Sequence, residues 1–515
     1  MIPRTRLGMA WRFALCGVLL VAGAAATTAV AGLLQVKTIV GEISVNPGIV
    51  SKQIVLPKPG APQTILLIGS DHRIGEPFSL ANTDTMLLVR LNAKSSTINV
   101  MSIPRDLQVD IPGHGIAKIN AAYSEGGYGL LIKTIKQNVF PNLRVNHIVD
   151  TNFSGFSQLV DAIGCVYSDV DRRYYNDSNS GLPGDSYSSI DIEPGYAKLC
   201  GHNQSVSGAL PFVRFRHLDS DIVREARQQD FIRWAKDQFN VSKLLSQKDK
   251  LLRIFGKNST LDKGLESTDG ILDLFNLVLN ADASTIHQVS FPADLQPCTA
   301  TSCVVTGNQE AEQAAFQHFM AATPKAKTAA ANKAKVTPAS LKGHKRIAKI
   351  PTGGLTADTS DGRAQGAALA HAGMPVYYPR LIKAGSEYCM STTGNCVGGG
   401  EPPEQYIHSY PRQYLIRDQK DRPHASYRMT LVLNPVLGQY YGVQGTSWSN
   451  PPLLRSPSGT RDIAGKHLLL YANGGRLTTV AWKVGPDWYW ISNTLTSNIP
   501  NPQMVGIAAS LTAAR

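Results

Sequence analysis

The sequence predicts an α/β protein with three parts: a single N-terminal transmembrane helix, a core of α-β-α layers, and a C-terminal α+β domain that contains an antiparallel meander. Three observations predict this fold class. An uncharged apolar run starts at Phe13, short apolar runs alternate with helical patterns from Thr64 to Phe239, and strand patterns separated by tight turns follow Gly353. With 515 residues, of which 43% are apolar, the chain can form two or three buried cores.

The first apolar run extends from Phe13 to Leu34 and contains no charged side chain. As a helix its 22 residues would span about 33 Å, which is enough to cross a bilayer. A cleavable signal peptide is the alternative, because the small residues from Ala22 to Ala26 could be cut by a peptidase. The length of the run favours a single-pass anchor in the cell membrane. The N-terminus would then be cytoplasmic, and most of the chain would be extracytoplasmic.

The formal net charge of +13 is concentrated in two segments. Arg4, Arg6 and Arg12 precede the apolar run, and eight lysines and arginines without any acid lie between Thr323 and Ile350. Together these segments hold 11 of the 13 excess positive charges, so the rest of the chain is close to neutral. A basic nucleic-acid-binding face is therefore poorly supported, and we predict no nucleic-acid partner.

Seven cysteines agree with export to an oxidising compartment. Cys16 lies in the apolar run, and the other six form three local pairs: Cys165 with Cys200, Cys298 with Cys303, and Cys389 with Cys396. Three disulfides are expected, although the sequence does not prove the connectivity. A zinc site is the weaker alternative, because the spacings are not of the two-residue type and no histidine pair accompanies them.

Apolar periodicity predicts the elements of the core in order. Strands are expected at residues 64–68, 85–91, 97–103 and 146–151, and helices at residues 129–139, 153–163 and 221–239. The Ala, Lys, Thr and Pro stretch that follows has no apolar periodicity, which is typical of a flexible linker. The predicted organisation is a cytoplasmic segment 1–12, an anchor 13–34, a stem 35–63, a core domain 64–321, a linker 322–352 and an accessory domain 353–515.

The accessory domain is expected to begin with a helix at 362–372 and to continue with strands at 429–433, 439–443, 467–471, 477–484 and 488–491. A C-terminal helix would close this antiparallel meander. Trp488 and Trp490 alternate along a strand and therefore share one face. That face could stack on a sugar, but packing in the core is the favoured interpretation. The role of this domain is not indicated by its sequence.

Polar residues of complementary types follow the predicted strands of the core. Asp71 and Asp84 offer hard oxygen ligands that suit Mg²⁺. Six further side chains can donate hydrogen bonds to phosphate oxygens, and these are Arg73, Arg105, Arg214, Arg216, Arg224 and Gln228. A pyrophosphate ligand needs this combination of metal and arginines.

Each of these residues also has a simpler interpretation. The Arg214 and Arg216 pair, or the Arg224 and Gln228 pair, taken alone is more often an exposed face, and Arg227 is predicted to be solvated. His217 is expected to be structural, and Asp106 could be a cap that positions Arg105.

Short motifs follow one another along the predicted core. In order they are GSDHR at 69–73, NTDTM at 82–86, SIPRDL at 102–107, KINAAY at 118–123, NFSGFSQLVDAIG at 152–164, IDIEPGYAKLCG at 190–201, VRFRH at 213–217 and DIVREARQQDF at 221–231. This series resembles the LytR-CpsA-Psr family, in particular its actinobacterial members. About eight blocks in the right order cover roughly residues 64–239. One departure is Asn82, where many family members have an arginine.

The resemblance implies a membrane-anchored transferase that moves a phosphate-linked glycopolymer from a polyprenyl pyrophosphate donor to a peptidoglycan acceptor. It implies an α-β-α layered core of that family, Mg²⁺ held by Asp71 and Asp84, and donor oxygens bound by the arginines and Gln228. Arg105, Asp84 and Asp71 would be the catalytic residues. The lipid tail would enter an apolar tunnel, for which the helix at 129–139 supplies candidate residues.

Two other functions are carried as alternatives. One is a pyrophosphatase that hydrolyses the lipid-linked glycan without attaching it to the wall. The other is a non-catalytic wall-binding or regulatory membrane protein. Attachment of glycan to peptidoglycan would distinguish the transferase from both.

Overall fold

A computed structural model of the chain describes most of the predicted core and accessory domain. The described residues are 44–45, 53–55, 61–70, 83–92, 95, 97–176, 189–201, 207–215, 221–238, 248–265, 286–295, 304–321, 349–391, 396, 408–435, 437–473 and 475–514. The predicted anchor and most of the predicted linker lie outside these ranges. Among the helices within them, none is long and apolar enough to span a membrane.

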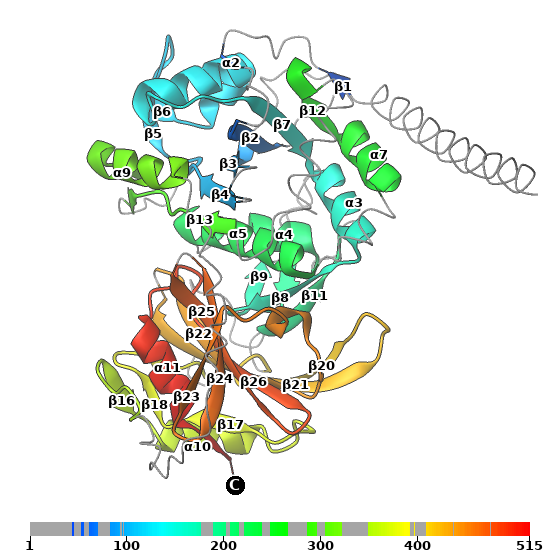
Figure 1. Cartoon of the computed structure of the whole chain (residues 1–515), viewed down its shortest axis with the longest axis vertical. Helices are drawn as coiled ribbons and strands as arrows, with labels where there is room; N and C mark the ends of the chain where they lie inside the picture. Colours follow the sequence, from blue (N-terminus) through cyan, green and yellow to red (C-terminus); the bar gives the residue numbers. More distant parts are fainter. Residues whose placement is uncertain are drawn as a thin grey trace, which may run out of the picture.

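The core contains a mixed seven-stranded sheet (Figure 1). Its spatial order is β1 (Ser44–Val45), β12 (Ser259–Leu261), β7 (His147–Asn152), β2 (Gln63–Ser70), β3 (Thr83–Asn92), β4 (Thr97–Ser102) and β13 (Ile286–Gln288). The central strand β2 pairs antiparallel with β3 and parallel with β7. The central strands are nearly continuous apolar runs because both faces of the sheet are buried.

Alternate residues of β2 point to opposite faces and belong to different apolar clusters. Leu66 and Ile68 pack in the cluster that includes α2 (Ala121–Asn138) and α9 (Gln309–Met320), whereas Ile65 packs with Leu261 and Leu265 in the second cluster. The predicted helix at 129–139 therefore exists but begins earlier, at Ala121. Two short hairpins flank this part of the sheet, formed by β5 (Gln108–Ile111) with β6 (Gly115–Lys118) and by β14 (Ala293–Leu295) with β15 (Val305–Gly307).

Helix α3 (Phe153–Ile163) starts directly after β7, at the predicted boundary. The Asn152 side chain caps it by accepting a hydrogen bond from the Gly155 N–H at 2.8 Å, and Gly164 ends it with a φ of 94°. Helix α7 (Lys248–Asn258) packs beside α3. The side chain of Asn258 leaves no room for a side chain at Gly155, because a Cβ there would lie 2.4 Å from the Asn258 Cβ.

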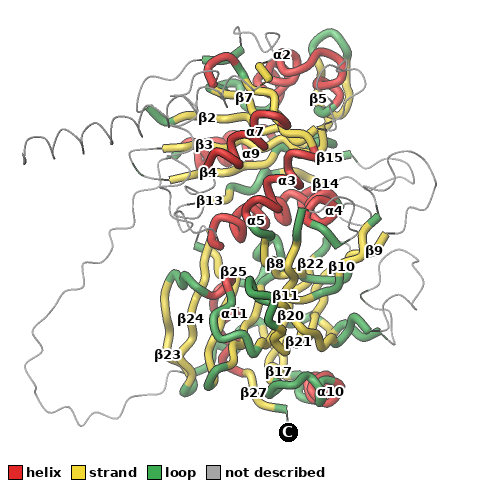
Figure 2. Tube along the Cα trace, turned by 90° about the vertical axis from the view of Figure 1, so that its right-hand side faces the viewer, coloured by secondary structure: helices red, strands yellow, loops and turns green. Residues whose placement is uncertain are grey.

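A smaller unit separates the seven-stranded sheet from the C-terminal part of the chain (Figure 2). It consists of β8 (Val166–Val170), β9 (Tyr174–Asn176), β10 (Ile190–Ile192), β11 (Gly195–Leu199), α4 (Ala209–Arg214) and α5 (Asp221–Gln238). Strands β8 and β11 form one antiparallel pair, and β9 and β10 form another. The disulfide between Cys165 and Cys200 joins the start of β8 to the end of β11.

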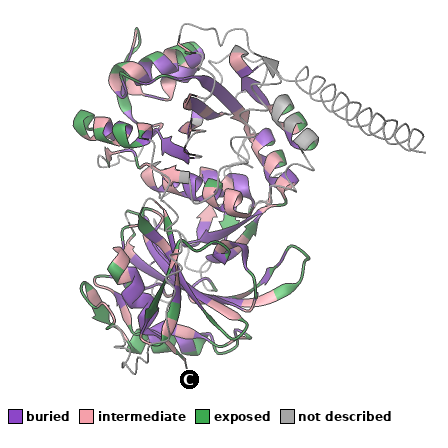
Figure 3. Ribbon diagram, viewed as in Figure 1, coloured by how far each residue is buried: buried purple, intermediate pink, exposed green. Residues whose placement is uncertain are grey.

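The C-terminal part is built on an eight-stranded antiparallel sheet that is buried along most of its central strands (Figure 3). Its strands are β19 (Glu387–Tyr388), β20 (Arg412–Arg417), β21 (Pro423–Asn434), β22 (Gln439–Thr446), β23 (Gly459–Ile463), β24 (Lys466–Asn473), β25 (Arg476–Val484) and β26 (Asp487–Ser492). Strand β22 pairs with β26 and not with the next strand in sequence, so two meanders are joined at this pair.

Two helices and two small strand pairs complete this part. Helix α10 (Ser360–Ala368) is the predicted first helix, ending four residues earlier than expected, and α11 (Asn501–Ser510) is the predicted closing helix. The small pairs are β16 (Leu355–Ala357) with β18 (Leu381–Lys383), and β17 (Tyr377–Pro379) with β27 (Leu511–Ala513). Met504, Ile507 and Ala508 of α11 are fully buried against the sheet.

The two parts meet across β8, whose Asp169 is only 6% exposed. Its Oδ1 accepts hydrogen bonds from Arg428 Nη1 and Gln444 Nε2, each at 2.7 Å, and its Oδ2 accepts one from Trp490 Nε1 at 3.2 Å. Around this carboxylate lies an apolar cluster with members from both parts: Tyr167, Tyr196, Ile416, Trp448, Leu454, Tyr471, Ala481 and Trp490. Core packing of Trp490 is therefore confirmed, and Trp488 packs against the same cluster while half-buried.

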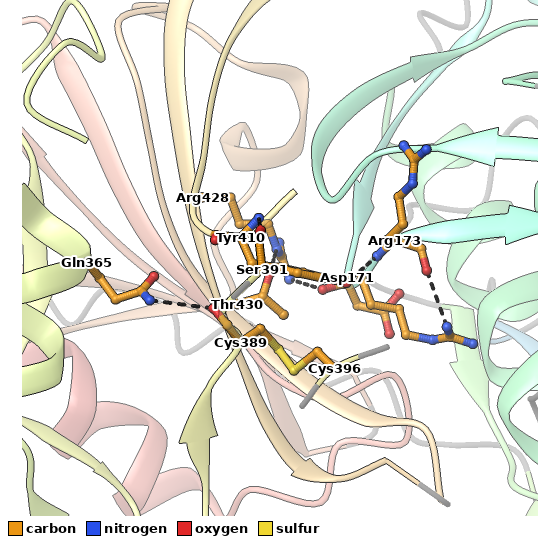
Figure 4. The surroundings of a disulfide bond; sticks show 10 residues. Asp171, Arg173, Gln365, Cys389, Ser391, Cys396, Tyr410, Arg428 and Thr430 are labelled. Carbon is orange, nitrogen blue, oxygen red and sulfur yellow. Dashed lines mark hydrogen bonds between the residues drawn. A yellow bond between two sulfur atoms is a disulfide. The ribbon is translucent and has the colours of Figure 1, made fainter. Parts of the chain in front are cut away.

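A second group of contacts surrounds the disulfide between Cys389 and Cys396 (Figure 4). Arg428 Nη2 donates to the Asp171 carbonyl at 2.8 Å, and the Arg173 N–H donates to the Tyr410 hydroxyl at 2.8 Å. The Cys389 N–H donates to the Thr430 carbonyl of β21 at 2.8 Å, which ties the disulfide loop to the sheet beside the interface between the two parts.

Candidate functional site

The ends of four neighbouring strands meet at one edge of the seven-stranded sheet. Ser70 at the end of β2 pairs with Thr83 at the start of β3 and with Asn152 at the end of β7. Ser102 at the end of β4 pairs with Leu87, and the next residue donates its N–H to the Met86 carbonyl at 2.8 Å. The described residues of the predicted motifs at these strand ends therefore lie together at this edge.

The predicted site residues fall into three groups. Asp71, Arg73, Arg216 and His217 lie outside the described residues, as does Asn82. Asp84 is described only as a backbone position of β3. The side chains that the structure describes are those of Arg105, Arg214, Arg224 and Gln228.

The backbone places Asp84 in an irregularity of β3, opposite the end of β2. Between Gly69 and Ser70 the register shifts, so that Gly69 pairs with Thr85 and Ser70 with Thr83. Asp84 is thus the extra residue of a β-bulge, a feature that is common beside active sites. Asp71 follows Ser70 directly in sequence. Carboxylates such as those of Asp71 and Asp84 have the donor chemistry that a hard divalent cation prefers. Within the described residues no group of three or more His, Cys, Asp or Glu side chains could hold a metal ion.

Asp150 on β7 accepts hydrogen bonds from three side chains on the buried side of this edge. Its Oδ1 accepts a hydrogen bond from Ser70 Oγ at 2.7 Å, and its Oδ2 accepts from the hydroxyls of Tyr123 at 2.6 Å and Tyr128 at 2.8 Å. Burial, together with the negative charge of Asp150, raises the pKa of both tyrosines, so the hydroxyls stay protonated donors. This cluster holds the end of β2, whose last residue, Ser70, directly precedes Asp71 in the sequence.

A break in α2 makes the double tyrosine contact possible. Two residues five positions apart on a straight helix are separated by about 140° around its axis, so they cannot reach the same atom. Here Gly126 and Gly127 leave the helical conformation, and Gly127 adopts φ 61° and ψ −154°. Side chains are rarely tolerated in that region of backbone conformation. The glycine pair therefore turns Tyr123 and Tyr128 toward one carboxylate.

Gln228 connects α5 to both the sheet and α4. Its Nε2 donates to Thr85 Oγ1 at 3.0 Å and to the Val213 carbonyl at 3.0 Å. Arg214, the last residue of α4, is half-buried, and its guanidinium lies 4.1 Å from the centre of the Phe153 ring. Arg214 is therefore held close to the start of β3, where the bulge lies.

Arg227 was predicted to be solvated, and this prediction is wrong, because Arg227 is completely buried. Its Nη1 donates to the carbonyls of Phe212 at 3.2 Å and Phe215 at 2.8 Å, and its guanidinium lies 4.6 Å from the centre of the Tyr174 ring. These acceptors lie at the C-terminal end of α4, where unpaired carbonyls attract cations. Helical spacing could not reveal this, since the partner helix is known only from the fold.

Arg224 and Gln228 are also buried, at 3% and 7% exposure, so neither lies on a solvated face. Arg105 is half-buried in a turn after β4, and its carbonyl accepts a hydrogen bond from the Asn120 N–H at 3.3 Å. The next residue, Asp106, is buried and forms an ion pair with Lys118 at 2.8 Å. Asp106 thus anchors the turn that presents Arg105, as the alternative interpretation proposed.

Sequence reasoning missed Ser70, Thr85 and Asp150. The signal for Asp150 in the sequence is a single acid at the end of the apolar run HIVD. Of the predicted disulfides, two are present, and Cys298 and Cys303 lie outside the described residues.

Comparisons with known proteins assign the chain to a family. The family model described as the LytR_cpsA_psr family matches residues 32–321. The chain therefore belongs to the LytR-CpsA-Psr family.

Two relatives carry names that describe an activity. The polyisoprenyl-teichoic acid–peptidoglycan teichoic acid transferase TagT of Bacillus subtilis is 29% identical over 210 residues, and TagU of Oceanobacillus iheyensis, with the same description, is 30% identical over 216 residues. Each match covers 40% of this chain. The matched segments span 62% of the length of TagT and 61% of the length of TagU. The crystal structure of B. subtilis TagV matches 51% of this chain and 97% of its own, with 21% identity and a TM-score of 0.40.

Proposed function

We propose that this chain is a transferase that moves a phosphate-linked glycopolymer from a polyprenyl pyrophosphate carrier to peptidoglycan. Membership of the family supports the reaction class, because two relatives are named as transferases of this kind. The observation that carries the proposal for this chain is the sheet edge at which the β2–β3 bulge, the Arg105 turn and the end of α4 converge.

The proposed reaction is a displacement at phosphorus. A hydroxyl oxygen of a wall sugar bonds to the phosphorus that carries the glycan, and the bond from that phosphorus to the bridging oxygen breaks. Polyprenyl phosphate leaves with the electron pair, and the hydroxyl proton is released. Arg105, Arg214 and Arg224 would bind the phosphate oxygens and stabilise the charge that develops on the leaving group.

Mg²⁺ is proposed as the cofactor, with Asp71 and Asp84 as its protein ligands. When bound, it would neutralise oxygens of the pyrophosphate. Arg73, Arg216 and Gln228 complete the proposed donor contacts. The polyprenyl chain would enter the apolar core between α2 and the sheet, where Leu131, Ile132 and Ile135 are located.

We also propose that the chain is anchored in the cell membrane by residues 13–34 and acts outside the cytoplasm. The disulfides between Cys165 and Cys200 and between Cys389 and Cys396 support an oxidising compartment.

The direct test uses the full chain in lipid nanodiscs, a short-chain polyprenyl pyrophosphate carrying a radiolabelled saccharide, and peptidoglycan strands. We expect Mg²⁺-dependent transfer of label to peptidoglycan with release of polyprenyl phosphate, and loss of both with EDTA. Release of label without attachment would instead identify a pyrophosphatase. If neither occurs, and no polyprenyl lipid copurifies by mass spectrometry, the chain is a non-catalytic wall-binding or regulatory protein.

A further inference from the structure

A cavity of about 470 Å³ lies between α5 and the C-terminal sheet, beside a face of α5 adjacent to the one that carries Gln228. Figures 1 and 2 both show α5 between the seven-stranded sheet and the end of the β24–β25 hairpin. The lining residues come from both parts of the molecule: Ile222, Glu225, Ala226, Gln229, Gln288, Ser290, Phe291, Asn473, Arg476, Leu495, Thr496, Ser497 and Asn498. Its volume is within the range of roughly 300 to 1,000 Å³ that small-molecule sites occupy.

The chemistry of the lining excludes two classes of ligand. Nine of the 13 lining residues are polar, so the cavity is unsuited to a lipid chain. Glu225 and Arg476 are its charged members, and their opposite charges cancel. An anion such as phosphate or pyrophosphate would meet no excess of positive charge here. The lining therefore fits a neutral, polar ligand.

The polar groups are of the type that bind sugar hydroxyls. Four carboxamides, those of Gln229, Gln288, Asn473 and Asn498, line the cavity, and each offers donors and an acceptor. Asn473 Nδ2 donates to Gln288 Oε1 across the boundary between the two parts. The Oδ1 of Asn473 is buried and has no hydrogen-bond partner among the described residues. Such an atom is costly to leave unpaired, and a ligand hydroxyl would satisfy it.

We infer that this cavity is a binding site for a neutral saccharide, formed jointly by the family domain and the C-terminal part. Phe291, which is 5% exposed, supplies an apolar surface for the carbon–hydrogen face of a sugar ring.

The position of the cavity assigns the saccharide to the acceptor strand, and this assignment rests on the proposed function. Gln228 binds Thr85 at the sheet edge, whereas Glu225 and Gln229 line the cavity. Successive residues of a helix are turned by about 100°, so these side chains occupy adjacent faces of α5. A saccharide in the cavity is thus separated from the proposed donor site by the width of one helix, and the next sugars of the same strand can reach that site.

The test measures binding of chitotetraose, a neutral oligomer of N-acetylglucosamine, to the full chain in nanodiscs by isothermal titration calorimetry. Ser290 is exposed and lines the cavity, so Ser290→Trp should block the site without disturbing the fold. Thr460→Trp is the matched control, because Thr460 is exposed on β23 and does not line the cavity. We expect Ser290→Trp and Asn473→Ala to weaken binding at least tenfold, and Thr460→Trp to bind like the wild type.

Three results would overturn the inference: no binding of chitotetraose by the wild type at millimolar concentration, equal binding by Ser290→Trp, or displacement of chitotetraose by a peptidoglycan stem peptide. A separate assay measures binding of the polyprenyl pyrophosphate donor in the absence of an acceptor. Ser290→Trp should retain donor binding while losing transfer to peptidoglycan. Saccharide binding that is sensitive to Ser290→Trp, in a wild type that transfers no label from the donor to peptidoglycan, would refute the proposed function and leave the binding site standing.

Discussion

Single side chains of the candidate site depend on neighbours that are distant in sequence. Asp106 and Lys118 hold the turn that presents Arg105, and Arg227 holds the end of α4 from which Arg214 projects. Asp106 and Arg227 are buried charges that have polar partners. Replacing either residue would therefore displace Arg105 or Arg214, which the proposed reaction uses. The predicted roles of Asp71, Arg73, Asp84 and the arginines remain predictions at this scale.

Arg105→Lys should reduce the rate of transfer tenfold to a hundredfold. Lysine keeps the positive charge but lacks the planar pair of donors that an arginine offers to phosphate oxygens. A charge-assisted hydrogen bond of this kind contributes roughly 1.5 to 3 kcal/mol, which gives the expected range. The measurement is kcat/KM for label transfer. Combining Arg105→Lys with Asp84→Asn should give less than the product of the two losses, because both groups address one ligand; multiplicative losses would argue against a shared site.

At the scale of single elements, α2 differs from a regular helix because its helical backbone is interrupted at Gly126 and Gly127. The break directs two tyrosines to Asp150, and a helix of regular geometry could not do so.

Gly127→Ala should destabilise the fold by about 1 to 3 kcal/mol, because alanine is strained at φ 61° and ψ −154°. Gly129→Ala is a close control in the same helix, since no atom lies within 4 Å of a Cβ added there. That control should be neutral or more stable by up to about 1 kcal/mol. Urea unfolding followed by circular dichroism measures both. Equal stabilities of the two variants would show that the break in α2 carries no conformational requirement.

Helix α9 contains a carboxyl group that makes stability depend on pH. Burial raises the pKa of Glu312 to about 7, from an ordinary value of 4.5. Since the folded pKa is the higher one, the stabilisation from the retained proton is complete below pH 4.5 and is lost as the pH rises through 7.

Glu312→Gln should therefore be more stable than the wild type at pH 8, by about 1 kcal/mol after allowance for solvent screening, and should lose the difference at pH 4.5. Glu310→Gln provides the control, because Glu310 lies in the same first turn but is exposed. Thermal unfolding at both pH values tests the prediction, and parallel pH profiles of wild type and Glu312→Gln would contradict it.

At the scale of the whole molecule, the C-terminal part packs on the family domain through a buried ion pair and an aromatic cluster. Deleting residues 353–515 would expose Tyr167 and Tyr196 and leave Asp169 without its three donors. The two parts are therefore expected to unfold together.

Arg428→Met should destabilise the protein by about 3 to 5 kcal/mol, because the Asp169 carboxylate would remain buried without its cation. Arg417→Met is the matched control on the neighbouring strand, where the pair with Asp421 is exposed and contributes at most about 1 kcal/mol. Calorimetry of the full chain should show one transition in the wild type and two separate transitions in Arg428→Met. A single unshifted transition in Arg428→Met would mean that the ion pair does not couple the two parts.

The sequence alone determined the positions of α3, α5, strands β2, β3, β4 and β7 of the first sheet, and strands β21, β22, β24, β25 and β26 of the second, because apolar periodicity of 2 or 3.6 residues is a local property. It also indicated the family, the cysteine pairs at 165–200 and 389–396, and the strand ends at which polar motifs gather. Only the tertiary structure decided that Arg227 is buried, that Asp150 binds Ser70 and two tyrosines, and that β22 pairs with β26. Each of these features depends on contacts between residues that lie far apart along the chain. Such contacts leave no periodic signal in a single sequence.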